Sequence, residues 1–299
     1  MSVSLYVAVL CSAGCDDSLK SVSVIEETRV LGARVEVEAD QTRSSPNPGE
    51  RASLRFFVAA PNGEPNFSYA LSVCAVRLTN NGFPPCASPP FASAQQADPT
   101  SADARVDFRV PEDVDLETTP HAFADGLICP DSGLNVGPDG APSCVTGSGI
   151  EVAFEFDLGG PGQSNQSPTF SADAFSLDGT PWPASAETSC DDDSLRQVTA
   201  RSPHALRIDL ADSDFETLTQ QTSVDPALET LLLSPFSSAG KLEHGFLALS
   251  RDAPPEQSQV SWDASLPAGG PPALVRFYFV VRDTRGGEDF ARRALCVAP

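Results

Sequence analysis

The sequence predicts an all-β protein with two sandwich domains in tandem, and three observations support that prediction. Stretches in which apolar and polar residues alternate recur along the chain, and this period of two is typical of half-buried strands. Turn-forming residues separate these stretches at roughly eight- to twelve-residue intervals, a spacing common in sandwiches. The 27 prolines also disfavour helices. The 299 residues are enough for two ordinary cores.

The N-terminal residues predict export. Residues 1–14 carry no charged side chain, which fits a signal peptide, and the run is too short to span a membrane. The stretch from Leu10 to Cys15 resembles a bacterial lipobox, with Ser12 where leucine is usual. The resemblance implies a lipoprotein signal peptide over residues 1–14, a lipidated Cys15 and an acidic tether over residues 15–28. The alternatives are a plain secretion signal or a cytosolic start with an apolar strand.

The first sandwich is expected over residues 29–158. Residues 33–38 read Ala-Arg-Val-Glu-Val-Glu, which places apolar side chains on one face and charges on the other. Similar patterns give the expected strands 33–38, 54–58, 69–76, 105–110 and 150–157. Residues 78–103 and 111–148 lack a clear alternation, and we expect two long loops there, restrained by cysteines.

A Gly/Pro/Ser-rich linker over residues 159–168 is expected to lead into a second sandwich, residues 169–299. The expected strands are 204–210, 231–233, 242–249, 260–264, 274–282 and 291–297. The last two are predicted to form a hairpin, because Asp-Thr-Arg-Gly-Gly at 283–287 favours a tight turn. Asp225 followed by Pro226 predicts the start of one short helix.

The cysteines support export. Eight are present, and removal of Cys11 with the signal and lipidation of Cys15 leave six. An even number in an exported chain predicts three disulfides. Six cysteines allow 15 connectivities, and we favour the sequential one. The favoured pairs are Cys74–Cys86, Cys129–Cys144 and Cys190–Cys296. No two cysteines after Cys15 have the close spacing of zinc ligands, so zinc is not expected.

Two features resemble bacterial Ig-like domains. One is the Pro48-Gly49 turn that precedes an alternating strand, and the other is the closing hairpin from Phe277 to Val297. The chain after its signal resembles two-domain Ig-like lipoproteins of large-genome Gram-negative bacteria. The resemblance implies two Ig-like sandwiches and carries no activity with it. Trp262 lies far nearer to Cys296 than to Cys190, so the Cys…Trp…Cys spacing of a true immunoglobulin domain is not met.

Charge and residue spacing exclude several functions. The 19 basic and 41 acidic residues give a net charge of −22, which disfavours nucleic-acid binding. The three histidines, His121, His204 and His244, are scattered, and no G-x-S-x-G nucleophile motif is present. The group Arg282, Asp283 and Arg285 in the last hairpin is interpreted as a turn with a surface ion pair, with a recognition tip as the alternative.

Acidic residues leave two further alternatives open. Paired carboxylates in a cleft would suit a secreted carbohydrate-active enzyme. Aspartate-rich loops would suit a Ca²⁺-stabilised adhesin. The loops are Asp191 to Asp193, Asp209 with Asp212 and Asp214, and Asp131 with Asn135 and Asp139. None matches the EF-hand pattern.

The leading hypothesis is a non-enzymatic cell-envelope lipoprotein that serves as a binding or assembly module. We predict no catalytic residue, metal or cofactor. The expected location is the outer membrane or cell surface, with a lipid anchor as the contact to the membrane. The partner would be a protein or a glycan, and no nucleic acid.

Overall fold

The computed structural model describes residues 22–76, 89–100, 103–160, 164–185, 189–191, 195–200, 202–218, 227–252, 254–264 and 271–298. The predicted signal peptide and Cys15 lie outside these residues. Regular structure within them is strand, apart from two short 3-10 turns, η1 (Asp212–Asp214) and η2 (Pro255–Ser258). Among the described residues no helix is long and apolar enough to cross a membrane.

The first sandwich consists of two antiparallel sheets. One has the order β1-β2-β5, with β1 (Arg29–Val37), β2 (Arg51–Ala59) and β5 (Ala104–Arg109). The other has the order β4-β3-β6-β9, with β4 (Ala92–Thr100), β3 (Phe67–Val76), β6 (His121–Pro130) and β9 (Ile150–Asp157). The alternation predicted these faces correctly, since Val35 and Leu54 lie opposite each other and are both fully buried in the core between the sheets.

The second sandwich also has two sheets. The first has the order β11-β10-β13-β19-β17, with β11 (Thr180–Pro181), β10 (Phe175–Leu177), β13 (Pro203–Ile208), β19 (Gln259–Asp263) and β17 (Lys241–Leu242). The second has the order β12-β21-β20-β16-β18, with β12 (Gln197–Thr199), β21 (Glu288–Ala298), β20 (Ala273–Arg282), β16 (Leu231–Ser237) and β18 (Leu247–Leu249). Its core contains Trp262, Phe277 and Phe279, each fully buried. The fold is therefore all-β, with two sandwiches whose crossed strand order is Ig-like.

The prediction of two long loops was wrong in part. Residues 92–100 form the edge strand β4, and residues 121–130 form β6, which pairs with both β3 and β9. Neither has a clear apolar alternation: β4 is largely exposed, and β6 contains small residues such as Ala122, Ala124 and Gly126. Residues 134–144 add a small hairpin, β7 (Leu134–Val136) with β8 (Pro142–Cys144).

The predicted short helix was also wrong within the described residues. Asp225 and Pro226 lie outside them, and the two residues that follow form a short strand, β15 (Ala227–Leu228). This strand pairs with β14 (Thr217–Leu218). Capping residues are only a weak signal where too few residues follow to bury a helical face.

Two cysteine pairs lie at disulfide distance, and both pairs were favoured from the sequence. Cys129–Cys144 joins the end of β6 to β8, and Cys190–Cys296 joins the chain before β12 to β21. Cys86 lies outside the described residues, so the predicted Cys74–Cys86 pair is not described. Cys296 packs in a small cluster apart from the main core. Trp262 lies inside that core.

The described parts of the expected tether and linker, residues 22–28, 159–160 and 164–168, are held against the sandwiches. In the tether, the amide of Ile25 donates to the carbonyl of Ser237 at 2.8 Å, and Ile25 is fully buried. In the linker, Asn165 is buried, and its carbonyl accepts a 2.9 Å hydrogen bond from the amide of Ser44. Loop composition alone does not reveal such pairing, because backbone donors and acceptors are present in every residue.

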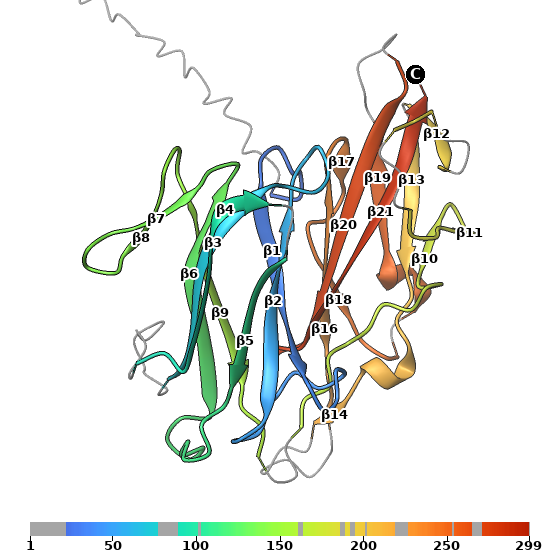
Figure 1. Cartoon of the computed structure of the whole chain (residues 1–299). Coiled ribbons are helices and arrows are strands. Elements are labelled where there is room, and N and C mark those ends of the chain that lie inside the picture. The colour runs from blue at the N-terminus through green and yellow to red at the C-terminus, as the bar shows by residue number, and fades with distance from the viewer. Residues whose placement is uncertain are drawn as a thin grey trace, which may run out of the picture.

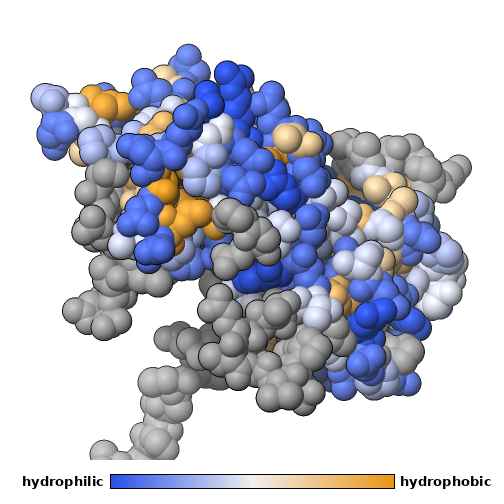
Figure 2. Space-filling model, turned by 90° about the horizontal axis from the view of Figure 1, so that it is seen from below, coloured by the Kyte–Doolittle hydropathy of each residue, from blue (hydrophilic) through white to orange (hydrophobic). Residues whose placement is uncertain are grey.

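The two sandwiches lie side by side, with β1 and β2 of the first facing β20 and β21 of the second (Figure 1). Between them lies a separate apolar cluster that includes Ile25, Phe57, Tyr278 and Val280. The face shown in Figure 2 is mostly hydrophilic, in keeping with the net charge of −22.

Candidate functional site

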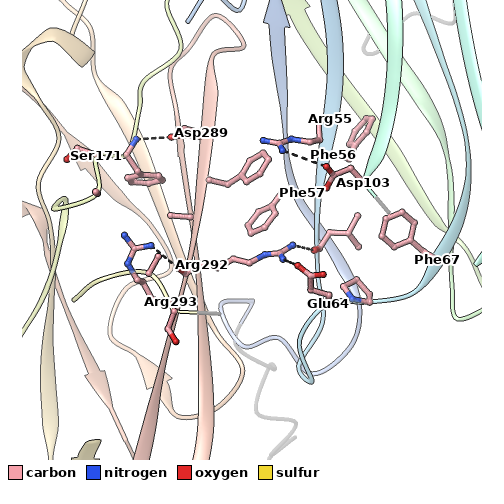
Figure 3. Close-up of a pocket in the computed structure, with 18 residues that line it drawn as sticks. Arg55, Phe56, Phe57, Glu64, Phe67, Asp103, Ser171, Asp289, Arg292 and Arg293 are labelled. Atoms are coloured by element: carbon pink, nitrogen blue, oxygen red, sulfur yellow. Dashed lines mark hydrogen bonds and ion pairs between the residues drawn. The ribbon is translucent and has the colours of Figure 1, made fainter. Parts of the chain in front are cut away.

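A cleft of about 490 Å³ opens at the join of the two sandwiches. Strand β2 supplies one wall with residues 55–58, and strand β21 supplies the other with residues 289–293 (Figure 3). Residues 170–172 and 184–185 of the second sandwich and Glu64, Pro65, Phe67 and Asp103 of the first complete the lining. This volume falls within the range of small-molecule sites in proteins.

An aromatic pair joins the two walls. Phe57 on β2 stacks on Phe290 on β21, with ring centroids 4.3 Å apart and planes within 4°. The guanidinium of Arg55 lies 4.9 Å from the centroid of Phe290, and that of Arg292 lies 5.1 Å from the centroid of Phe57. Cations at this distance are attracted to the ring face. The four side chains therefore form a stack that covers both ring faces and leaves neither for a ligand.

Each carboxylate of the cleft is paired with an arginine. Glu64 lies 2.5 Å from Arg292, and Asp103 lies 3.7 Å from Arg55. Asp289 pairs with Arg34 of the first sandwich. Glycoside hydrolysis needs one carboxyl group to donate a proton and a second to act as base or nucleophile. Carboxylates held as partners of arginines are poorly suited to those roles.

Arg293 differs from these arginines. It is 6% exposed, and its guanidinium lies 3.9 Å from the centroid of Phe175. It donates to two main-chain carbonyls, from Nε to Trp182 at 2.9 Å and from Nη1 to Arg292 at 2.7 Å. No carboxylate of the described residues lies within ion-pair distance of it. Burial lowers the pKa of the Arg293 guanidinium.

Buried charged groups fix the orientation of the walls. Glu288, which is 5% exposed, accepts a 2.8 Å hydrogen bond from the amide of Ala33 and lies 3.3 Å from Arg282. Burial raises the pKa of Glu288 to about 7, although Arg282 and the Ala33 amide act in the opposite direction. Gly32 leaves the room for this carboxylate, because a Cβ there would lie 2.3 Å from its Oε2.

Asp283 and Arg285, in the turn of the closing hairpin, make contacts within the protein. The interpretation of this group as a surface ion pair was therefore wrong. Asp283 is 8% exposed and accepts hydrogen bonds from the amides of Arg285 and Gly287, at 2.7 and 2.8 Å. Arg285 pairs with Glu216 and with Glu229, which is 1% exposed. Burial raises the pKa of Asp283 and of Glu229, despite these bonds. Asp283 and Arg285 are thus engaged within the chain, and they give no support to the alternative of a recognition tip.

The histidines lie apart from the cleft. His121 at the start of β6 lies 2.8 Å from Asp157. His204 on β13 contacts Asp178 at 2.8 Å and the hydroxyl of Ser202 at 3.3 Å, an order of groups that resembles a hydrolase triad. However, its Nε2 is equally close to the carbonyl of Thr199, at 3.3 Å. Ser202 therefore shares the histidine with a main-chain carbonyl, and the group fits a structural link between a turn and a strand.

The aspartate-rich loops have other partners. Asp214 accepts hydrogen bonds from the amides of Ala211 and Thr169, and Asp139 accepts one from Ala141. Asp209 pairs with Arg207 at 2.8 Å. Asp192 and Asp193 lie outside the described residues. Within the residues that the structure describes, no group of three or more acidic, histidine or cysteine side chains is arranged to hold a metal ion.

Comparisons with known proteins add little beyond the fold. No protein-family model matches the chain, and the search of curated proteins found no match. Among solved structures it is similar to extracellular cadherin domains 1–4 of protocadherin gamma B7, at 10% identity and a TM-score of 0.21 over 89% of this chain and 50% of that one. It is also similar to the collagen adhesin of S. aureus, at 7% identity and a TM-score of 0.14 over 92% and 95% of the two chains. The chain thus spans about half of the protocadherin structure. These scores are too low to support a functional argument.

Sequence reasoning missed the cleft and its charged residues. The stretch that contains Glu288 and Arg293 was assigned only to the closing hairpin. One available signal was the pair Arg292-Arg293 beside the apolar run Ala294 to Val297, since neighbouring residues of a strand point to opposite faces and one of the two arginines must face inward. Buried arginine needs partners, so this pair pointed to a second packed surface.

Proposed function

We propose that this chain is an exported, lipid-anchored protein of the cell envelope that acts as a non-enzymatic binding module. Its ligand site would be the cleft between the sandwiches. Two cysteine pairs at disulfide distance support export, since disulfides persist in oxidising compartments. The lipidated residue would be Cys15, and the tether would place the sandwiches at the membrane surface.

One observation carries the binding role: among the residues that the structure describes, the cleft is lined by a cation without a carboxylate partner, Arg293, and its carboxylates all pair with arginines. The stack of Arg55, Phe290, Phe57 and Arg292 holds its walls together. The carboxylates on those walls are engaged with arginines. A rigid, preformed cleft binds with a low cost in conformational entropy. A carbohydrate-active enzyme using paired carboxylates is therefore the less favoured alternative.

Lipidation is tested by metabolic labelling of producing cells with a palmitate analogue. The wild type should be labelled and should fractionate with membranes, and Cys15→Ala should lose the label. Undiminished labelling of Cys15→Ala would reject this anchor.

The binding role is tested with the purified chain in a thermal-shift screen of small envelope components, such as sugars, amino acids and short acids. At least one compound should raise the Tm and be recovered unchanged. The variant Ala184→Trp, which fills the cleft from its rim, should abolish that shift, whereas Val136→Trp on the remote β7–β8 hairpin should keep it. Turnover of a compound, or a shift that Ala184→Trp leaves intact, would contradict the proposal.

A further inference from the structure

Arg293 is held in place before any ligand arrives. Its guanidinium rests on the Phe175 ring and donates to the carbonyls of Trp182 and Arg292. These contacts fix both its position and its orientation. A guanidinium has five N–H groups in a planar fork, so donors remain for a further acceptor.

The charge of Arg293 is not balanced within the described residues. Three other arginines at the join of the sandwiches, Arg55, Arg282 and Arg292, lie within 4 Å of a carboxylate. Arg293 is more buried than these three, and its hydrogen-bond acceptors among the described residues are main-chain carbonyls. A buried cation without a counter-ion is costly. Because this cation lines an open cleft, an anion from outside can remove that cost.

We propose that the cleft binds a small ligand with a single carboxylate, which pairs with Arg293. The inference rests on the binding role proposed above and adds the chemical class of the ligand. A planar carboxylate matches the guanidinium fork. A dianion is disfavoured, because Glu64, Asp103 and Asp289 line the same cleft and the whole chain carries −22.

The cleft also restricts the rest of the ligand. The faces of Phe57 and Phe290 are covered by each other and by arginines, so ring stacking on them is closed to a ligand. Ala172, Ala184 and Ala291 leave the open space beside Arg293. A compact acid, or the free C-terminal carboxylate of a short peptide, has the required chemistry.

The test is calorimetric titration of the full purified chain with acetate, benzoate and a tripeptide with a free C-terminus. Each has a neutral control: acetamide, benzamide and the tripeptide amide. At least one acid should bind, and its amide should bind at least about tenfold more weakly, since charge-assisted hydrogen bonds are the stronger kind. The acid that binds best distinguishes a free small acid from a peptide end.

Variants assign the effect to one side chain. Arg293→Gln should weaken acid binding at least about tenfold. The control is Arg276→Gln, because Arg276 lies outside the cleft and, among the described residues, also has a main-chain carbonyl and no carboxylate as its partner. It should change acid binding by less than about threefold. If Arg293→Gln fails to fold, Ala184→Trp should still block acid binding. Equal binding of acids and amides, no binding of any acid, or unchanged binding in both cleft variants would overturn the carboxylate assignment. A neutral ligand that Ala184→Trp excludes would still leave the broader binding role intact.

Discussion

The carboxylate of Glu288, in the second sandwich, accepts a 2.8 Å hydrogen bond from the amide of Ala33, in the first. Glu288 also faces the Arg282 guanidinium, 3.3 Å away, and Asp283 on the same hairpin. The bond crosses the join of the sandwiches and is buried. The orientation of the two cleft walls thus depends on Glu288, which is a titratable group.

Stability should depend on the charge of Glu288. Its pKa is about 7 in the folded chain, against an ordinary value of 4.5. Between these values the folded state holds a proton that the unfolded chain has released. The free energy of unfolding should therefore fall as pH rises from about 4.5 to about 7, and the contribution of Glu288 should be fully present below that range. Each pKa unit corresponds to about 1.4 kcal/mol, which sets an upper limit of roughly 3 kcal/mol.

Urea unfolding at pH 5 and pH 8 checks this expectation. Glu288→Gln removes the titration and keeps an acceptor for the Ala33 amide. The variant should lose less stability than the wild type over that range. Glu112→Gln, in the first sandwich, serves as a control, because its ion pair with Arg109 is exposed. Parallel pH profiles for wild type and Glu288→Gln would show that Glu288 does not titrate in this window.

The stacked rings should contribute strongly to the join. Phe57 is 2% exposed and contacts both Phe290 and Tyr278. Phe57→Ala should lower the free energy of unfolding by about 3–5 kcal/mol, because it leaves a cavity between the sandwiches. Phe246→Ala removes a ring that is 65% exposed and should change stability by less than about 0.5 kcal/mol. Urea unfolding of both variants measures the difference, and equal effects would contradict the role of the stack.

The sequence predicted the strands whose burial alternates and missed those without alternation. Strands β1 and β5 pack one face on a core and alternate in burial, so the sequence pattern at 33–38 and 105–110 reports burial directly. β4 is an exposed edge strand, and its pattern carries no such information. β6 packs small residues beside its neighbours, including Gly126, where a Cβ would lie 2.1 Å from the Ala70 carbonyl oxygen.

The join itself could not be read from the sequence. The outward faces of β1, β2 and β20 contain Leu31, Phe57, Tyr278 and Val280, which a single sandwich would leave exposed. In the sequence, each of them is one more apolar residue in a strand that is already apolar. Their partners are more than 200 residues away, as in the hydrogen bond from the Tyr278 hydroxyl to the Ala60 carbonyl at 2.6 Å. No local pattern specifies such a pairing.

The two disulfides should stabilise to different degrees. Cys190–Cys296 closes a loop of 106 residues, and Cys129–Cys144 closes one of 15. In the chain-entropy model these loops correspond to about 4.7 and about 3 kcal/mol. The double variant Cys190→Ala/Cys296→Ala should therefore unfold at a lower urea concentration than Cys129→Ala/Cys144→Ala. The opposite order would show that native-state packing, and not loop length, decides their contributions.

Arg285 and Glu229 should be strongly coupled. Glu229 is 1% exposed, and its Oε1 lies 3.2 Å from Nε of Arg285. Removal of the cation by Arg285→Met leaves a buried carboxylate unpaired, and it should lower the free energy of unfolding by about 3–5 kcal/mol. The double variant Arg285→Met/Glu229→Leu removes the unpaired charge and should recover much of that loss, because apolar replacements of a buried ion pair are often neutral or better.

A double-mutant cycle completed with Glu229→Leu gives the coupling energy between Arg285 and Glu229. A cycle that is additive within about 0.5 kcal/mol would show that the two groups act independently. In that case the burial of Glu229 would have to be balanced by groups other than Arg285.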